Sequence, residues 1–169
     1  VNSTHCELIS FVDDGYDDCE ICYAFKLELA DRVKDILTLE VLANVLSCGD
    51  CAILTADLRD KAGVTYGVDG AVTVMPSEAI VTLRFTVARG DVLCGIKTAE
   101  RALSKPITEE CLQQTKAFLC DNVCILSDNL NDYVDRYTDN LITLKKDVSP
   151  EKQAQIIAAV TIDDCNDML

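Results

Sequence analysis

The stretch AIVTLRFTVA, residues 79–88, alternates apolar and polar side chains more regularly than any other part of the chain. Every second side chain from Ala79 to Val87 is apolar, and three of the four between them are polar. Successive side chains of a β-strand point to opposite faces, so this pattern predicts a strand with one face on a core. The stretch therefore predicts an antiparallel sheet with one covered face.

Strand signals continue upstream of this stretch. Residues 52–59 alternate in the same way, and residues 63–75 have the pattern of a hairpin. Asp69-Gly70 would supply the positive backbone angles of a type I′ turn within that hairpin. Pro76-Ser77-Glu78 would then turn the chain into the strand described above. Three or four antiparallel strands are expected.

Apolar residues recur at steps of three and four on both sides of the strands, as expected of amphipathic helices. Asp17 followed by Glu20 has the form of a capping box, which predicts a helix from Asp18 to Ile36. Thr38 would cap a second, short helix over residues 39–46. Downstream helices are expected over residues 96–103 and 108–119, over 119–144 as one long amphipathic helix, and from Ser149-Pro150 to about Val160.

These elements predict a single α+β domain over residues 1–169, in which a helical layer with one long amphipathic helix packs on a small antiparallel sheet. The domain would begin with a flexible acidic segment, residues 1–17, followed by a helical segment, 18–50. The strands would occupy residues 51–90. A second helical segment, 91–169, would complete the fold.

Ten cysteines in 169 residues suggest a disulfide framework of about five bridges, formed in an oxidising compartment. The spacing does not fix which cysteines pair. Most lie in or beside the expected helices, so the helical layer would be cross-linked and the sheet would not. The ten are Cys6, Cys19, Cys22, Cys48, Cys51, Cys94, Cys111, Cys120, Cys124 and Cys165.

A zinc site is the alternative use of four of these cysteines. Cys19 and Cys22 form one C-x2-C pair, and Cys48 and Cys51 form a second after a gap of 25 residues. Four thiolates at such spacing can hold zinc tetrahedrally. The gap is longer than usual and six cysteines would remain unexplained, so disulfides are the favoured interpretation and no metal or cofactor is expected.

Part of the chain resembles a saposin-like module. The resemblance is carried by Cys19, Cys22 and Cys48 around an amphipathic stretch, and by Cys124, the helix around residues 133–137, the Ser149-Pro150-Glu151 cap and Cys165. It implies a secreted, helical, lipid-binding domain over about half of the chain. The strands expected between residues 52 and 88 have no place in that fold.

Composition argues against several classes of function. The net charge is −14, which disfavours nucleic acid and anionic membranes as partners. His5 is the only histidine, so a catalytic triad or a histidine metal site is not expected, and the chain is predicted not to be an enzyme. The acidic pairs Asp13-Asp14, Asp17-Asp18 and Asp163-Asp164 leave calcium binding open.

The remaining motifs favour a secreted binding protein. Asn2-Ser3-Thr4 is a glycosylation sequon, and Arg89-Gly90-Asp91 matches an integrin-binding tripeptide placed where a strand ends. The expected function is an extracellular glycoprotein that recognises a protein partner, with or without homo-oligomerisation. The alternatives are a carrier of a lipid or other small apolar ligand between helices and sheet, and adhesion through Arg89-Gly90-Asp91.

Overall fold

The computed structural model describes residues 15, 17–125 and 130–168. Within them it contains an antiparallel sheet of three strands in the order β1-β3-β2. The elements, in chain order, are β1 (Asp18–Glu28), α1 (Arg32–Ser47), α2 (Ile53–Thr55), a π-helical turn η1 (Ala56–Lys61), β2 (Asp69–Val74), β3 (Glu78–Ala88), a 3₁₀ turn η2 (Arg89–Asp91), α3 (Val92–Leu103), α4 (Glu109–Ile125), α5 (Leu130–Thr143), α6 (Pro150–Ala159) and α7 (Ile162–Asp167).

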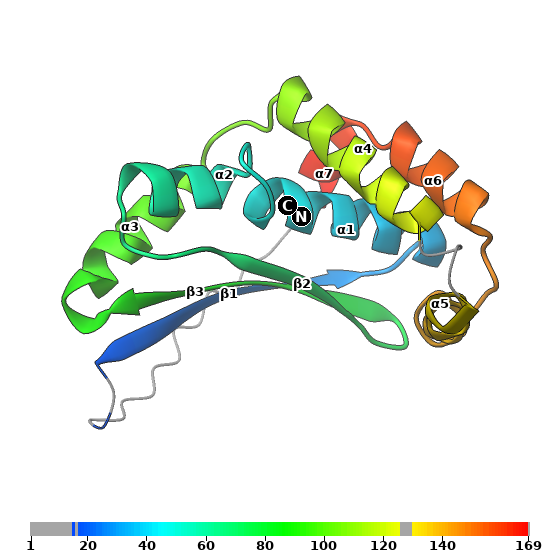
Figure 1. Cartoon of the computed structure of the whole chain (residues 1–169), viewed down its shortest axis with the longest axis horizontal. Coiled ribbons are helices and arrows are strands. Elements are labelled where there is room, and N and C mark those ends of the chain that lie inside the picture. Colours follow the sequence, from blue (N-terminus) through cyan, green and yellow to red (C-terminus); the bar gives the residue numbers. More distant parts are fainter. Residues whose placement is uncertain (1–14, 16, 126–129, 169) are drawn as a thin grey trace.

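The labelled helices other than α5 lie on one face of the sheet, and α5 lies beside the end of the sheet (Figure 1). Helix α1 contacts β2 and β3 on one side and α4, α6 and α7 on the other. Helix α3 contacts β1 and β3 near the end of the sheet where β3 finishes. The α+β class with a small antiparallel sheet and a helical layer is therefore confirmed.

Strand β3 is the centre of the sheet and lies where the sequence predicts it. Its apolar side chains at alternate positions are 0% to 3% exposed, whereas Arg84 and Thr86 on the other face are exposed. Strand β1 pairs with it along its whole length, and β2 pairs with the part from Arg84 back to Ala79. The buried side chains are Ala79, Val81, Leu83, Phe85 and Val87.

The first expected helix is wrong, because residues 18–28 form β1. Ile21 and Phe25 are four residues apart, and that spacing fits one face of a helix and one face of a strand equally well. Tyr23 and Leu27 lie between and beyond them and complete the strand pattern, in which alternate side chains contact the core. The proposed Asp17–Glu20 capping box does not exist.

Helix α1 is buried on nearly all sides, and a helix buried in this way has no single apolar face. Asp31 caps its start by accepting the Lys34 backbone N–H at 3.3 Å. Thr38, the expected cap of a shorter helix, lies inside α1 with a buried hydroxyl. The helix thus has a sheet on one side and other helices on the other.

Three further boundaries differ from the sequence prediction. Residues 52–59, expected as a strand, form α2 and part of η1, and Asp69-Gly70, expected as a turn, begin β2. The expected long helix is interrupted, because α4 ends at Ile125 and α5 runs in another direction from Leu130 (Figure 1). Ser149 does cap α6, by accepting the Lys152 backbone N–H at 3.3 Å.

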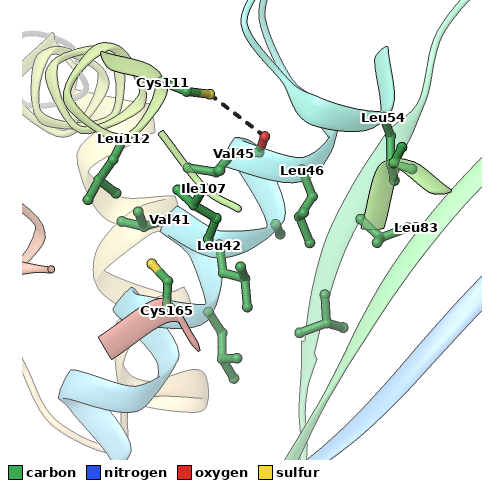
Figure 2. Packing of buried hydrophobic residues seen from close by; sticks show 14 of the residues in the cluster. Val41, Leu42, Val45, Leu46, Leu54, Leu83, Ile107, Cys111, Leu112 and Cys165 are labelled. Atoms are coloured by element: carbon green, nitrogen blue, oxygen red, sulfur yellow. Dashed lines mark hydrogen bonds between the residues drawn. The ribbon is translucent and has the colours of Figure 1, made fainter. Parts of the chain in front are cut away.

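The expected disulfide framework is wrong for the nine cysteines that the structure describes, because no two of them are joined by a disulfide bond. Figure 2 shows Cys111 on α4 and Cys165 on α7 among aliphatic side chains. Burial raises the pKa of Cys111 to about 12 and that of Cys165 to about 11, so both thiols stay protonated. Buried thiols of this kind pack as small apolar side chains.

The saposin-like resemblance does not describe the fold. Cys19 and Cys22 lie in a strand, and three strands form the layer beneath the helices. The division at residues 18, 51 and 91 also fails to separate helices from strands, since β1 precedes α1. Whether the segment 1–17 is flexible stays a prediction, because 1–14 lie outside the described residues.

Candidate functional site

A groove of about 950 Å³ opens at the end of the sheet, between β3 and the segment that leads into β2. We call it the loop–sheet groove. One wall is the loop of residues 63–68 with the first residue of β2. The other wall is the last part of β3, residues 84–88. The groove is lined by Asp18, Glu20, residues 63–69, residues 84–88 and Asp91.

Local backbone requirements shape the loop wall. Gly63 has a φ of 64°, a left-handed conformation that favours glycine, and it turns the chain out of η1. The Val64 N–H donates to the Leu58 carbonyl at 3.0 Å. The Thr65 hydroxyl donates to the Gly67 carbonyl at 3.0 Å and accepts the Gly67 N–H at 3.4 Å. These contacts hold residues 63–67 as a defined turn.

Gly70, the second residue of β2, lies directly against α1. A Cβ atom at this position would lie 2.2 Å from the Ser47 hydroxyl oxygen and 3.0 Å from the Ala43 carbonyl oxygen, both on α1. The backbone of β2 therefore approaches α1 more closely than a residue with a side chain allows. This contact positions the loop wall relative to β3.

Carboxylates dominate the charge of the groove. Asp18, Glu20, Asp69 and Asp91 line it, and the one basic residue among its lining residues is Arg84. Asp69 accepts a hydrogen bond from the Arg84 guanidinium at 2.8 Å, and this hydrogen bond raises the pKa of Arg84. With Arg84 neutralised in this way, the groove presents a negative surface.

Tyr66 is the aromatic side chain at the rim, and it is fully exposed. A fully exposed aromatic ring held on a defined turn at the edge of a groove is a natural contact for a ligand. No motif in the sequence pointed to it. The available signal was the position of a tyrosine between Gly63 and Gly67, which is typical of a tight loop.

An ion-pair cluster supports η1, the turn that carries the loop. The Asp57 carboxylate is buried and pairs with Lys105 at 2.5 Å and with Lys61 at 2.8 Å. Burial alone would raise the pKa of Asp57, but the hydrogen bonds and charges of the two lysines lower it overall. Lys105 follows α3, so the cluster fastens the loop-bearing turn to that helix.

Glu40 on α1 gives the chain a pH-dependent stability. Burial raises its pKa from 4.5 to about 7. Between these values the folded chain holds a proton that the unfolded chain releases, so the free energy of unfolding falls as pH rises from about 4.5 to 7. Glu40→Gln keeps the shape and removes this titration. We expect it to stabilise the chain at pH 8 by about 1 to 3 kcal/mol and not at pH 4.

Urea unfolding followed by circular dichroism at pH 4 and pH 8 measures this difference. Glu100→Gln, at an exposed position on α3, is the matched control and should change stability little at either pH. Equal stabilisation of Glu40→Gln at both pH values would contradict the assignment of the titration to Glu40.

The sequence-predicted sites are not brought together by the structure. Arg89-Gly90-Asp91 forms the exposed 3₁₀ turn η2 between β3 and α3, and the Arg89 N–H donates to the Asp17 carbonyl at 2.9 Å. Asp91 is the member of the tripeptide that lines the groove. The role of Arg89-Gly90-Asp91 as an interaction loop stays a prediction. Asn2, His5 and Cys6 lie outside the described residues.

The metal alternatives find no support in the described part of the chain, which contains no cluster of three or more histidine, cysteine, aspartate or glutamate side chains placed to hold a metal. Cys19 and Cys22 are on opposite faces of β1, so both cannot join one zinc site with Cys48 and Cys51. Asp164 serves instead in the capping box of α7 and pairs with Lys34 at 2.7 Å.

No protein-family model and no curated protein matches the sequence. Solved structures do match the fold. A peptidase M16 inactive domain from Pseudomonas fluorescens is 17% identical, with a TM-score of 0.74 over 90% of this chain and 38% of that one. A protease from Helicobacter pylori is 16% identical, with a TM-score of 0.74 over 92% and 38%.

The inactive peptidase domain of a putative zinc protease from Bordetella parapertussis is 15% identical, with a TM-score of 0.69. The match covers 95% of this chain and 88% of that domain. The chain thus spans less than two fifths of the Pseudomonas and Helicobacter chains but nearly all of the Bordetella domain. At these identities the likeness establishes a shared fold.

The fold overturns the function expected from the sequence. A secreted recognition protein, a lipid carrier and an adhesive domain were the expectations, but the structures that share the fold are a protease, a peptidase M16 inactive domain and the inactive domain of a zinc protease. The expectation rested on disulfides that the described cysteines do not form. An extracellular location stays a prediction of the sequence. Among the described helices, none combines the length and the apolar character that crossing a membrane requires.

Proposed function

We propose that this chain is a catalytically silent domain of a peptidase-like protein, which works beside a zinc-bearing domain of the same fold. The carrying observation is that a peptidase fold is combined with a single histidine, His5, in the whole sequence. Zinc proteases of the H-x-x-E-H type bind the metal through two histidines and use the glutamate as a base. This sequence supplies neither that motif nor a second histidine.

Two further observations support the proposal. Two of the similar structures are themselves described as inactive peptidase domains. The chain also matches 38% of the length of the Helicobacter pylori protease, which leaves room in that protein for a separate catalytic domain. A zinc-bearing domain in the same polypeptide or on a second one would supply the chemistry.

Zinc content and peptidase activity of the purified chain test whether the chain is catalytically silent. After removal of metal with EDTA and incubation with zinc sulfate, we expect no stoichiometric zinc and no zinc-dependent cleavage of a quenched-fluorescence peptide library. His5→Ala should behave as the unchanged chain does. One zinc per chain, with cleavage that EDTA abolishes, would overturn the proposal.

The proposed role beside a catalytic domain is tested with a zinc-bearing M16-type domain encoded in the same genome. We expect the two chains to elute together in size-exclusion chromatography and the rate of peptide cleavage to rise when this chain is added. Separate elution, with a rate that does not change, would contradict a role beside a catalytic domain.

A further inference from the structure

Strand β3 loses its partner on one side before it ends. Strand β2 begins at Asp69, which pairs with Arg84, whereas β3 continues to Ala88. On the other side, β1 pairs with β3 as far as Ala88. The last four residues of β3 therefore have a strand on one side and the loop–sheet groove on the other.

The register shows which backbone groups face the groove. The Arg89 N–H donates to the Asp17 carbonyl and the Leu29 N–H donates to the Ser77 carbonyl, so odd-numbered positions along β3 point toward β1. The Met75 N–H donates to the Glu78 carbonyl, on the β2 side. These orientations alternate along an antiparallel strand.

By this alternation, the backbone of Thr86 and the N–H of Ala88 point into the groove. Within the described part of the chain, no hydrogen bond joins loop 63–68 to either residue. The Thr86 N–H, the Thr86 carbonyl and the Ala88 N–H thus extend, beyond Arg84, the row of backbone groups through which β3 pairs with β2. An unpaired strand edge of this kind is a template for another extended segment.

The groove is large enough for such a segment. Four extended residues are about 13 Å long, which matches the length of β3 beyond Arg84. The volume of about 950 Å³ lies at the upper end of the range for ligand pockets. Tyr66, fully exposed on the opposite wall, offers a ring surface to the side chains of an inserted strand.

The negative charge of the groove favours a basic peptide as its ligand. The groove is lined by four carboxylates, and its one guanidinium, that of Arg84, is already paired with Asp69. Lysine and arginine side chains would be attracted. The chain's own residues 1–14 contain Glu7, Asp13 and Asp14 and no lysine or arginine, so they lack the complementary charge.

We propose that the loop–sheet groove binds an extended, basic peptide segment of another polypeptide as an added strand, paired with Thr86 and Ala88 of β3. This goes beyond the catalytically silent role proposed above, because peptide binding requires neither zinc nor a partner domain. Either proposal can fail without the other.

Proline at position 88 directly tests the backbone hydrogen bond between the Ala88 N–H and an added strand. Ala88 has a φ of −61°, which is the angle that proline imposes, and it is exposed. Ala88→Pro therefore removes the N–H that faces the groove without straining the backbone. Ala88→Ser keeps that N–H and is the matched control.

The probe is a fluorescein-labelled decapeptide of alternating lysine and threonine, and binding is measured by fluorescence anisotropy. We expect Ala88→Pro to weaken binding about tenfold, since a hydrogen bond is lost and the ring obstructs the strand, and Ala88→Ser to leave it unchanged. N-methylation of alternate peptide residues should weaken binding similarly. A glutamate–threonine decapeptide should bind at least about tenfold more weakly.

Non-specific attraction to a chain of charge −14 is the competing explanation, and it predicts that Ala88→Pro binds as well as the unchanged chain. Equal binding by a variant whose circular dichroism is unaltered would overturn the proposal, and so would failure of every peptide to bind at millimolar concentration.

Should Ala88→Pro fold poorly, the double variant Glu20→Gln, Asp91→Asn tests the proposal instead. We expect it to weaken lysine–threonine binding at least about threefold; unchanged binding would overturn the charge assignment.

Discussion

Gly70→Ala is expected to destabilise the chain by about 2 to 3 kcal/mol, which is large for the addition of one methyl group. The new Cβ would lie 2.2 Å from the Ser47 hydroxyl oxygen and 3.0 Å from the Ala43 carbonyl oxygen. The hydroxyl cannot simply rotate away at no cost, because it donates to that same carbonyl at 2.7 Å in a buried site. Urea unfolding followed by circular dichroism would show a lower midpoint.

Two companion variants make this expectation specific. Gly90 has no atom within 4 Å of an added Cβ, so Gly90→Ala should change stability by less than about 0.5 kcal/mol. Ser47→Ala removes the oxygen that lies 2.2 Å away but leaves the Ser47 Cβ at 3.0 Å. It should therefore rescue Gly70→Ala in part. If the double variant shows no coupling between the two sites, the close approach of β2 to α1 is not the cause.

Leu42→Ala is expected to lower the free energy of unfolding by about 3 to 4 kcal/mol. Leu42 is 1% exposed on α1, where helix and sheet meet with the other helices packed behind (Figure 2). Truncation removes buried apolar surface and leaves a cavity, because surrounding elements on two sides prevent the site from collapsing. The fall in the urea midpoint, with an unchanged slope, measures the loss.

The same truncation on the surface is the control. Leu93 is 71% exposed on α3, so Leu93→Ala should change the free energy of unfolding by less than about 0.5 kcal/mol. Comparable losses at positions 42 and 93 would contradict the placement of α1 as the buried helix between sheet and outer helices.

Part of the candidate site could be read from the sequence. The alternation of residues 79–88 predicts β3 and assigns Thr86 to its uncovered face. The groove itself could not be predicted, because it exists only where β2 begins opposite Arg84 and leaves the last four residues of β3 without a partner on that side. At the start of β2, Gly70 packs against Ser47, and these two residues are 23 positions apart in the sequence.

The cysteines show how composition misled the functional prediction. Ten cysteines are consistent with a disulfide framework, but a cysteine is also a small apolar side chain. Cys111 and Cys165 serve in that second way, with burial raising the pKa of both thiols. Only the surroundings of a thiol, which the sequence does not give, distinguish the two uses.

The sequence by itself determined the α+β class, strand β3, the Ser149-Pro150 start of α6 and the lack of a second histidine. These features depend on alternation, capping and residue identity, which are local or compositional. The tertiary structure alone decided that residues 18–28 are a strand, that α1 is buried on both sides, and that β2 begins beside an open groove. Each of these depends on which distant segment packs against the element, and burial by such a partner overrides the local pattern.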